Sequence, residues 1–460
     1  MSMSSKDSPF KIPFFKDTQL KEHDPELYEL IKLEEQRQYI GLELIASENY
    51  ASRSVMQALG SIFQNKYSEG QVGNRYYGGN EIIDKVEALC KTRSLEAFDL
   101  NNEWDVNVQP LSGSPANLCV YTAVLKPGEK LMGLHVYSGG HITHGFKTKE
   151  KIVSASAYFF DSDYYYLDPE TKSINYNDME KRVLEYKPKL LIAGASSYTK
   201  DWDYKRFRLA ADSVGALLMA DISHIAGLIA AKEHNNPFEY CDIVTTTTHK
   251  SLRGPRSGLI FYNHIKNPGL KEKIDYAVFP MLNGGPHNHQ IAAVATQMKE
   301  VKSFEFKEYA IQIKKNAKEL VNCLLEKGLT ILGNGTENHL FIWDVRPLGV
   351  SGLFIEKGLE KIHITVNKNL IIGDSSDSPI NPGGIRIGTP GITTRGMKED
   401  EMRIIGDIIY RFSILAEKNK NSSTIDEFLN NLQNEIEYEK LSNEVKQLSM
   451  KFKVPGVDDY

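Results

Sequence analysis

The stretch that decides the fold is Cys241–Gly258, CDIVTTTTHKSLRGPRSG. Ile243, Val244 and the threonines after them are β-branched and end in a polar segment with Gly and Pro, which predicts a buried strand ending near His249. Lys250 would then lie just beyond that strand. Because a buried charged lysine is unfavourable, a lysine held there beside a histidine and two arginines is a candidate amine with a lowered pKa, able to form a Schiff base. Judged alone, an exposed lysine at a strand end is the commoner case.

A second short apolar run, Ala216–Ala220, is followed at once by Asp221 and, three residues later, His224. An acid at the end of one strand and a lysine at the end of the next suit pyridoxal 5'-phosphate (PLP), whose ring nitrogen stays protonated beside a carboxylate so that the cofactor can accept electrons. Asp221 is therefore the candidate partner of the ring nitrogen. His224 is a candidate contact of the ring's phenolic oxygen or of the substrate.

The segment Leu111–Asn117, LSGSPAN, precedes an apolar helix expected to run to about Leu125. Ser114 as N-cap, Pro115 at the first helical position and Gly113 allowing close approach predict a helix N-terminus that can hold a dianionic phosphate. In isolation the same pattern also fits an ordinary capped helix, which is common.

Strands are expected at Lys151–Ala157 and at Leu190–Ala193, with a helix over Tyr176–Tyr186 between them. Strand, helix and strand in alternation predict right-handed βαβ units and a mostly parallel sheet. Ligand-binding residues of such sheets lie at the carboxyl ends of the strands, where Ser196, Asp221 and Lys250 all fall.

Composition limits the class of protein. A chain of 460 residues exceeds a usual single core, so two domains are expected. With 41% hydrophobic and 25% charged residues it has the composition of a soluble globular protein, and a net charge of −5 argues against nucleic-acid binding. No apolar run reaches the roughly 18 residues of a membrane span, and the N-terminal segment lacks secretory and transit patterns, so we expect the cytoplasm. The four cysteines show neither disulfide nor zinc spacing.

Several motifs, in order, give the chain a recognisable pattern: LIASEN at 44–49, SGSPAN at 112–117, ADISHIAGL at 220–228 and TTTTHKSLRGPRSG at 245–258. From about Leu20 to about Ala416 the chain resembles serine hydroxymethyltransferase, a fold-type I PLP-dependent transferase that moves a one-carbon unit between serine and tetrahydrofolate. The resemblance implies an α/β fold with a large, mostly parallel sheet domain and a smaller α+β C-terminal domain.

The expected division is a helical N-terminal arm over 1–45, a large PLP-binding α/β domain over 46–303 and a small α+β domain over 304–460. Asp24 as N-cap and Pro25 at the first helical position predict the start of the arm helix. The resemblance implies that this arm packs on a second subunit and that the assembly is a homodimer or homotetramer, with serine, glycine and folate as ligands.

The resemblance also implies a cofactor site. Lys250 would carry PLP, Asp221 would hold its ring nitrogen, and His141 would stack on the ring. Tyr67 would reach the cofactor phosphate, and the Gly284–Gly285 turn would contact the phosphate of the partner subunit. The complete set of expected cofactor residues is Tyr67, Ser112, Gly113, Ser114, His141, Ser196, Asp221, His224, His249, Lys250, Gly284 and Gly285.

Catalytic roles fall to Lys250, Glu69, His249, Asp221 and His141, with Glu69 expected to do acid–base work at the hydroxymethyl or folate end. Arg386 is expected to bind the substrate carboxylate, because a planar guanidinium pairs with a carboxylate through two parallel bonds. The remaining implied contacts are Ser47 and Tyr77 for the substrate, and Val136, Gly140, Ile142 and Asn369 for folate.

His141 and His144 lie three residues apart, a spacing that can bind a metal, but the nearby sequence offers no third ligand and we expect no metal. The chain departs from the family at Gln71-Val72, at His135–Ser138 and at Asn283, and we expect the first two departures to alter a loop shape and the folate affinity. A threonine aldolase or other fold-type I PLP enzyme, and a non-catalytic binding protein of the same fold, are the alternative interpretations. Together, Lys250, Asp221, His224 and Arg386 favour an enzyme.

Overall fold

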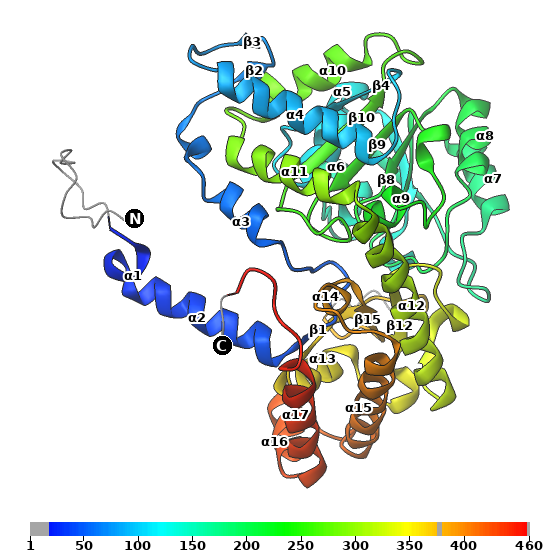
Figure 1. Cartoon of the computed structure of the whole chain (residues 1–460). Helices are drawn as coiled ribbons and strands as arrows, with labels where there is room; N and C mark the ends of the chain where they lie inside the picture. The colour runs from blue at the N-terminus through cyan, green and yellow to red at the C-terminus, as the bar shows by residue number, and fades with distance from the viewer. Residues whose placement is uncertain (1–17, 375–379, 458–460) are drawn as a thin grey trace.

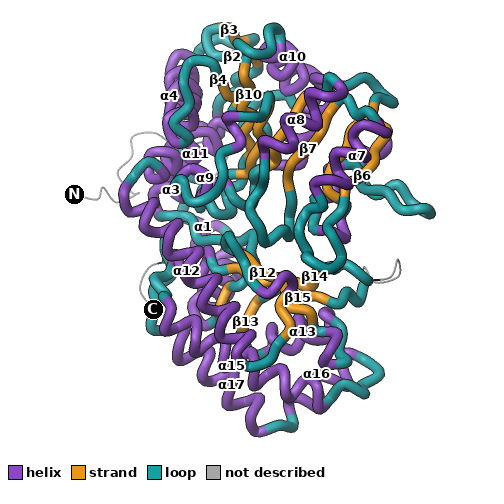
Figure 2. Tube along the Cα trace, turned by 90° about the vertical axis from the view of Figure 1, so that its right-hand side faces the viewer, coloured by secondary structure: helices purple, strands orange, loops and turns teal. Residues whose placement is uncertain are grey.

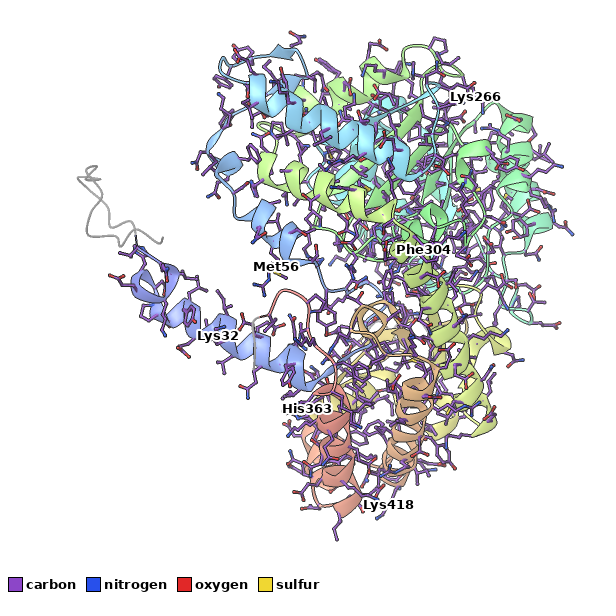
Figure 3. The ribbon with its side chains drawn as sticks, in the orientation of Figure 1. Lys32, Met56, Lys266, Phe304, His363 and Lys418 are labelled. Carbon is purple, nitrogen blue, oxygen red and sulfur yellow. The ribbon has the colours of Figure 1, made fainter. Side chains whose placement is uncertain are left out.

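The computed structural model describes residues 18–374 and 380–457. Figure 1 shows an upper body built on a large sheet, a lower body with its own helices, and an N-terminal helix reaching away from both. Helix α12 (Phe304–Glu326) runs from the upper body into the lower one, and Phe304, labelled in Figure 3, lies where the two meet.

The large body contains a seven-stranded sheet in the order β4-β10-β9-β8-β7-β5-β6. Its five strands from β6 to β9 are parallel, and β10 is antiparallel to both of its neighbours. All residues of β7, β9 and β10 are buried, as expected of strands covered on both faces. The strands are β4 (Trp104–Asn107), β5 (Lys130–Leu134), β6 (Asp161–Tyr165), β7 (Leu190–Gly194), β8 (Leu217–Asp221), β9 (Ile243–Thr247) and β10 (Gly258–Asn263).

Two apolar clusters cover the two faces of this sheet. One joins the sheet to α4 (Glu81–Ala97), α7 (Tyr176–Tyr186), α8 (Tyr204–Val214) and α11 (Asn288–Val301). The other joins it to α5 (Gly113–Val124) and α10 (Leu270–Tyr276). The large body is therefore a three-layered α/β structure, which confirms the predicted fold class.

The helix over Tyr176–Tyr186 is confirmed, as is the strand that begins at Leu190. The strand predicted at Lys151–Ala157 is wrong. Residues Ala155–Phe159 form the short helix α6, capped by Ser154, whose Oγ accepts a hydrogen bond from Ala157 N at 3.2 Å. A serine cap supplies a local acceptor for a backbone N–H, which favours a helical turn over a strand. The sheet strand follows instead as β6.

Helix α5 begins two residues earlier than the Ser114–Pro115 pattern predicts. Ser112 is its N-cap and Gly113 its first residue, so the prediction of Ser114 as N-cap is wrong. The reason lies in packing, because a Cβ on Gly113 would lie 2.6 Å from Thr247 Cγ2. Only glycine lets this helix start so close to the end of β9.

The small body has a four-stranded antiparallel sheet in the order β11-β12-β15-β14, with helices packed on it around a separate apolar core (Figure 2). The strands are β11 (Thr330–Ile331), β12 (Leu340–Asp344), β14 (Asn367–Asn369) and β15 (Gly384–Gly388). The helices are α13 (Gly352–Lys361), α14 (Pro390–Thr394), α15 (Glu399–Lys418), α16 (Ile425–Gln433) and α17 (Ile436–Ser449).

The N-terminal arm consists of α1 (Leu20–His23) and α2 (Pro25–Ile40), neither of which has a buried residue. Asp24 caps α2 as predicted, since its Oδ1 accepts from Leu27 N at 3.0 Å. Behind the arm, β1 (Leu42–Glu43) pairs in parallel with β13 (Ile364–Thr365) of the small body. Within residues 18–374 and 380–457, every helix is too short or too polar to cross a membrane.

Candidate active site

A cavity of about 320 Å³ opens at the carboxyl ends of β7, β8 and β9. The fold brings to it all of the predicted cofactor residues except Tyr67, Gly284 and Gly285. Its lining consists of Ser112, Gly113, Ser114, Asn117, His141, Ala195, Ser196, Asp221, Ser223, His224, Thr247, His249, Lys250 and Arg256.

Asp221 ends β8 and lies buried in this cavity. Its Oδ1 accepts hydrogen bonds from Ser223 N at 3.1 Å and Ser223 Oγ at 2.6 Å. Its Oδ2 accepts from Asn117 Nδ2 at 2.8 Å and lies 3.0 Å from His144 Nε2. Burial alone would raise the pKa of this carboxyl, but the hydrogen bond and charge of His144 and the bonds from Ser223 hold the pKa well below its usual value. Asp221 is thus a buried carboxylate kept ionised.

Lys250 lies three residues beyond β9, and its Nζ donates to Thr247 Oγ1 at 3.1 Å. Burial lowers the pKa of its amine to about 8, and the charges of Arg386 and Arg256 act in the same direction, against the charge of Asp221. The lowered pKa expected from the sequence is therefore present in the fold. At neutral pH an appreciable fraction of this amine is unprotonated and can act as a nucleophile.

Three predicted histidines surround the lysine. Burial lowers the pKa of His141 to about 4 and that of His249 to about 3, so both rings are neutral at pH 7. His249 Nδ1 is buried with no hydrogen-bond partner among the described residues, which leaves a polar atom at the cavity wall for a ligand. His224 is fully buried and stacks on His339, with ring centroids 5.5 Å apart.

The opposite end of the cavity is the N-terminus of α5. The first N–H groups of a helix have no acceptor within it, so those of Gly113 and Ser114 are directed outward to an anion. The Ser112 side chain makes no capping bond to them. The residues present fit PLP. The helix end suits its phosphate, the buried carboxylate suits its ring nitrogen, and the lysine of lowered pKa suits its aldehyde.

Arg386 lies on β15 of the small body and is buried. Its Nη1 donates to Ser196 O at 2.8 Å, its Nε to Asn367 Oδ1 at 3.0 Å and its Nη2 to Ser47 Oγ at 3.4 Å. Burial lowers the pKa of its guanidinium to about 10, which still leaves it charged at neutral pH. The fold therefore brings the predicted substrate residues Ser47 and Arg386 together beside the cavity residue Ser196.

The fold brings a third possible metal ligand, Asp221, close to His141 and His144, although the sequence near the two histidines offers none. Candidate ligand atoms of these two histidines and Asp221 lie within 4.8 Å of one another. These atoms already form hydrogen bonds, from His144 Nε2 to Asp221 Oδ2 and between His141 Nδ1 and Thr143 Oγ1 at 2.6 Å. The group is better described as a hydrogen-bonded network that orients the histidines.

The other predicted residues form a second cluster that does not line the cavity. A Cβ on Gly285 would lie 3.0 Å from Tyr67 Cε1, and one on Gly284 would lie 3.4 Å from Glu69 Oε1. The rings of Tyr67 and Tyr77 meet edge to face at 5.2 Å, and both are about half exposed. Within one chain, these residues are therefore not among those that line the cavity around Lys250.

Glu69 is held in this second cluster by its neighbours along the chain. Arg75 Nη1 donates to Ser68 O at 2.9 Å and to Gly70 O at 2.8 Å, the carbonyls on either side of Glu69. Arg75 also pairs with Glu87 at 2.6 Å, and both side chains are almost fully buried. The backbone on both sides of Glu69 is therefore held by hydrogen bonds, although the loop contains only the two-residue strands β2 (Gly70–Gln71) and β3 (Asn74–Arg75).

Of the predicted folate residues, only Asn369 lines a cavity, a narrow one between the two bodies. Its Oδ1 accepts from Ser197 Oγ at 2.8 Å. Gly140 does not line it, and a Cβ there would lie 1.8 Å from Leu134 O, so only glycine fits at this position. Val136 and Ile142 do not line it, whereas residues missed from the sequence do, among them Tyr137, Leu167, Lys172, Leu370 and Ile371.

Asn117, His144 and Thr247 are site residues that we had not assigned from the sequence. Asn117 follows Ser114 by one helical turn, and Thr247 shares a strand face with Thr245, whose Oγ1 donates to Asn117 Oδ1 at 2.7 Å. Helical and strand periodicity could have identified both once the cavity end of each element was known. His144 carried a signal only in its spacing from His141.

The mostly parallel sheet places Lys250 beyond β9, Asp221 at the end of the neighbouring strand β8 and the N-terminus of α5 beside both. This arrangement defines the class of fold-type I PLP-dependent enzymes. Within that class, the chain belongs to the serine hydroxymethyltransferase family, whose sequence model matches residues 20–409.

Named relatives cover nearly the whole chain. It is 49% identical over 455 residues to serine hydroxymethyltransferase 4 of Arabidopsis thaliana, with 96% of each chain covered. It is 48% identical over 461 residues to a Bombyx mori serine hydroxymethyltransferase, covering 96% of this chain and 99% of that one. It is 47% identical over 469 residues to serine hydroxymethyltransferase 3, chloroplastic, of Arabidopsis thaliana, covering 99% and 87%.

Proposed function

We propose that this chain is a PLP-dependent glycine hydroxymethyltransferase. It reversibly transfers the hydroxymethyl carbon of serine to tetrahydrofolate and yields glycine and 5,10-methylenetetrahydrofolate. The observation that carries the proposal is the pairing, in one cavity, of a lysine whose pKa is lowered to about 8 with a buried, ionised Asp221, next to a buried Arg386. Family membership supplies the reaction that this site serves.

Four groups of this chain would hold the cofactor. The N–H groups of Gly113 and Ser114 bind its phosphate, Asp221 keeps the proton on its ring nitrogen, His141 packs on its ring, and Lys250 supplies the amine for its attachment. Bound PLP supplies an electron sink for the bond that breaks in the amino acid. His224, His249 and Ser196 complete the wall around it.

Substrate binding uses the guanidinium of Arg386, which pairs with the carboxylate of serine and fixes the amino acid next to Lys250. Ser47 Oγ, which accepts from Arg386 Nη2, keeps the guanidinium plane oriented. Because Arg386 and Lys250 come from different bodies, substrate binding and cofactor attachment depend on how the two bodies are packed.

Glu69 and Tyr77 act from the neighbouring subunit. Glu69 holds or moves a proton at the hydroxyl oxygen of serine or at the folate end, and Tyr77 contacts the substrate. Tyr67 and the Gly284–Gly285 turn reach the cofactor phosphate across the same interface. The exposed apolar side chains of the arm, Leu27, Leu30 and Leu33, support a homodimer or a higher homo-oligomer built from it.

Asn369 and the narrow cavity that it lines are the proposed folate contact. We assign no metal ion to the group formed by His141, His144 and Asp221, in which His144 Nε2 and Asp221 Oδ2 lie 3.0 Å apart and form a hydrogen bond. We place the protein in the cytoplasm, and a relative named chloroplastic shows that the compartment varies among similar chains. Imaging a fluorescent fusion tests the compartment.

The function is tested by measuring serine cleavage by the purified, PLP-loaded protein with and without tetrahydrofolate. Folate-dependent formation of glycine is expected. Cleavage of threonine or phenylserine without any response to folate would favour an aldolase, and no turnover despite bound PLP would favour a binding protein. Borohydride reduction should attach the cofactor at Lys250, and attachment at another lysine would contradict the assignment.

A further inference from the structure

Asn49 is the last residue of the LIASEN motif and has no role in the function described above. Its amide is fully used. Nδ2 donates to the backbone carbonyl of Lys250 at 2.9 Å and to Tyr309 Oη at 2.7 Å. Oδ1 accepts from Tyr50 N at 2.9 Å and from Thr394 Oγ1 at 2.7 Å. A carboxamide has two N–H donors and two lone pairs, so this side chain has no spare hydrogen-bonding capacity.

The orientation of this amide follows from its backbone partners. A backbone N–H, that of Tyr50, can only donate, and a backbone carbonyl, that of Lys250, can only accept. Oδ1 and Nδ2 of Asn49 are therefore placed as described, and the flipped amide would lose both bonds.

The carbonyl of Lys250 has a second donor of its own. Arg253 N donates to Lys250 O at 3.0 Å and closes the turn after the lysine. With Asn49 the same oxygen accepts two hydrogen bonds, which is its capacity. The turn is held from inside by Arg253 and from 201 positions away in sequence by Asn49.

Both side-chain partners of Asn49 tie it to the small body. Thr394 ends α14, and Tyr309, near the start of α12 where the two bodies meet, donates from its Oη to Pro390 O at 3.3 Å. The chain leading to Asn49 is also bound there. Leu44 N donates to Thr365 O at 2.9 Å, and Gly388 N donates to Leu44 O at 2.8 Å. Gly388 is the last residue of β15, the strand that carries Arg386.

We infer that Asn49 is a positioning residue that fixes the turn of the cofactor-bearing Lys250 against the small body that carries Arg386. The inference rests on the proposed function and deepens it. It gives a role to the hydrogen bond between Asn49 and the main-chain carbonyl of Lys250, at the junction between the body that carries Lys250 and the body that carries Arg386. Asn49 is not among the residues that line the cavity, so it acts through Lys250.

The variants Asn49→Asp and Asn49→Ala test this inference. Asp has the same shape but no N–H donor, so it turns an acceptor toward the Lys250 carbonyl, whereas Ala removes the donors and the acceptor of the amide together. In cofactor-free protein given PLP, we expect the absorbance band of the lysine-bound cofactor to form about tenfold more slowly in Asn49→Ala and about 100-fold more slowly in Asn49→Asp. The band should also show a shifted pH dependence, which a purely structural defect would not produce.

Thr394→Val is the matched control. It removes the bonds from Thr394 Oγ1 to Asn49 Oδ1 and to Tyr309 Oη, and it leaves both bonds of Asn49 Nδ2, to Lys250 O and to Tyr309 Oη. It should form the band within about twofold of the wild-type rate. Wild-type band formation and pH dependence in a folded Asn49→Asp or Asn49→Ala protein would overturn the inference. So would an equal loss in Thr394→Val, because the contact with Lys250 would then not be the operative one.

The same variants separate this inference from the proposed function. If the wild type binds PLP at Lys250 but does not turn over serine, the proposed function fails while the band measurements still decide the role of Asn49. If turnover is present, we expect kcat to fall in the same order as the rate of band formation, with a smaller change in KM for serine. The reverse pattern, in which KM changes alone, would contradict a role through Lys250.

Discussion

Arg386 Nη1 donates a hydrogen bond to Ser196 O at 2.8 Å, which joins β15 of the small body to the segment after β7 of the large one. The described residues occupy three of the five N–H groups of this guanidinium, through Nη1, Nε and Nη2. Two N–H groups are left, the number that a bidentate pair with a carboxylate needs.

Replacing Arg386 by Lys is expected to lower kcat/KM for serine strongly while the absorbance of the lysine-bound cofactor stays near that of the wild type. Lysine keeps the charge but loses the fork and the bonds that orient it, and losing one partner of a buried charge pair costs about 2–5 kcal/mol. Kinetics and a serine titration of the cofactor spectrum provide the measurement. Serine binding to Arg386→Ala with wild-type affinity would show that the carboxylate is bound elsewhere.

The lowered pKa of Lys250 predicts a pH dependence of stability. Below pH 8 the amine is protonated in the folded and unfolded chains alike, and burying its charge destabilises the fold by about 3 kcal/mol. Between pH 8 and 10.5 the unfolded chain binds more protons, so this penalty is relieved as the pH rises.

Urea unfolding of the cofactor-free wild type and of Lys250→Met at pH 7 and pH 10 measures this effect. Methionine fills similar space without a charge, so Lys250→Met should be the more stable protein at pH 7, and the two should converge toward pH 10. The comparison cancels groups that titrate equally in both proteins. A stability difference that does not change with pH would show that Lys250 is not charged in a buried site.

Gly113 is expected to tolerate no side chain, because its Cβ would lie 2.6 Å from Thr247 Cγ2. Gly113→Ala should therefore displace the start of α5 and weaken PLP binding by about tenfold or more. Thr247→Ser removes the clashing methyl group and keeps the hydroxyl that accepts from Lys250. The double variant should recover most of the affinity, measured by equilibrium titration. If the double variant binds PLP as weakly as Gly113→Ala does, the clash with Thr247 is not the cause.

Subunit mixing tests whether Glu69 acts across an interface. Lys250→Ala and Glu69→Gln should each be nearly inactive as homo-oligomers. Mixed oligomers would contain one site with both residues intact and should recover part of the wild-type activity, up to about one quarter when the two chains mix at random in dimers. Demonstrated exchange without recovery would place Glu69 in the site of its own chain.

The sequence identified the strand ends that bear chemistry with good accuracy, because those signals are local. A short apolar run marks β8 and a β-branched run marks β9, and Asp221 and Lys250 lie where these patterns predict. Prediction failed where local signals competed. Residues 151–157 contain residues suited to a strand, but Ser154 caps a short helix there instead.

The sequence by itself determined the class of chemistry. Asp221 and Lys250 follow successive strands, and the SGSPAN motif starts a helix, so together they specify a parallel sheet with reactive groups at its carboxyl edge. Only the tertiary structure decided which distant residues serve that edge. Asn49 reaches the Lys250 carbonyl and Arg386 reaches Ser196 through packing of the two bodies. Hydrogen bonds between residues about 200 positions apart depend on the relative placement of whole elements, and no local pattern of residues encodes that placement.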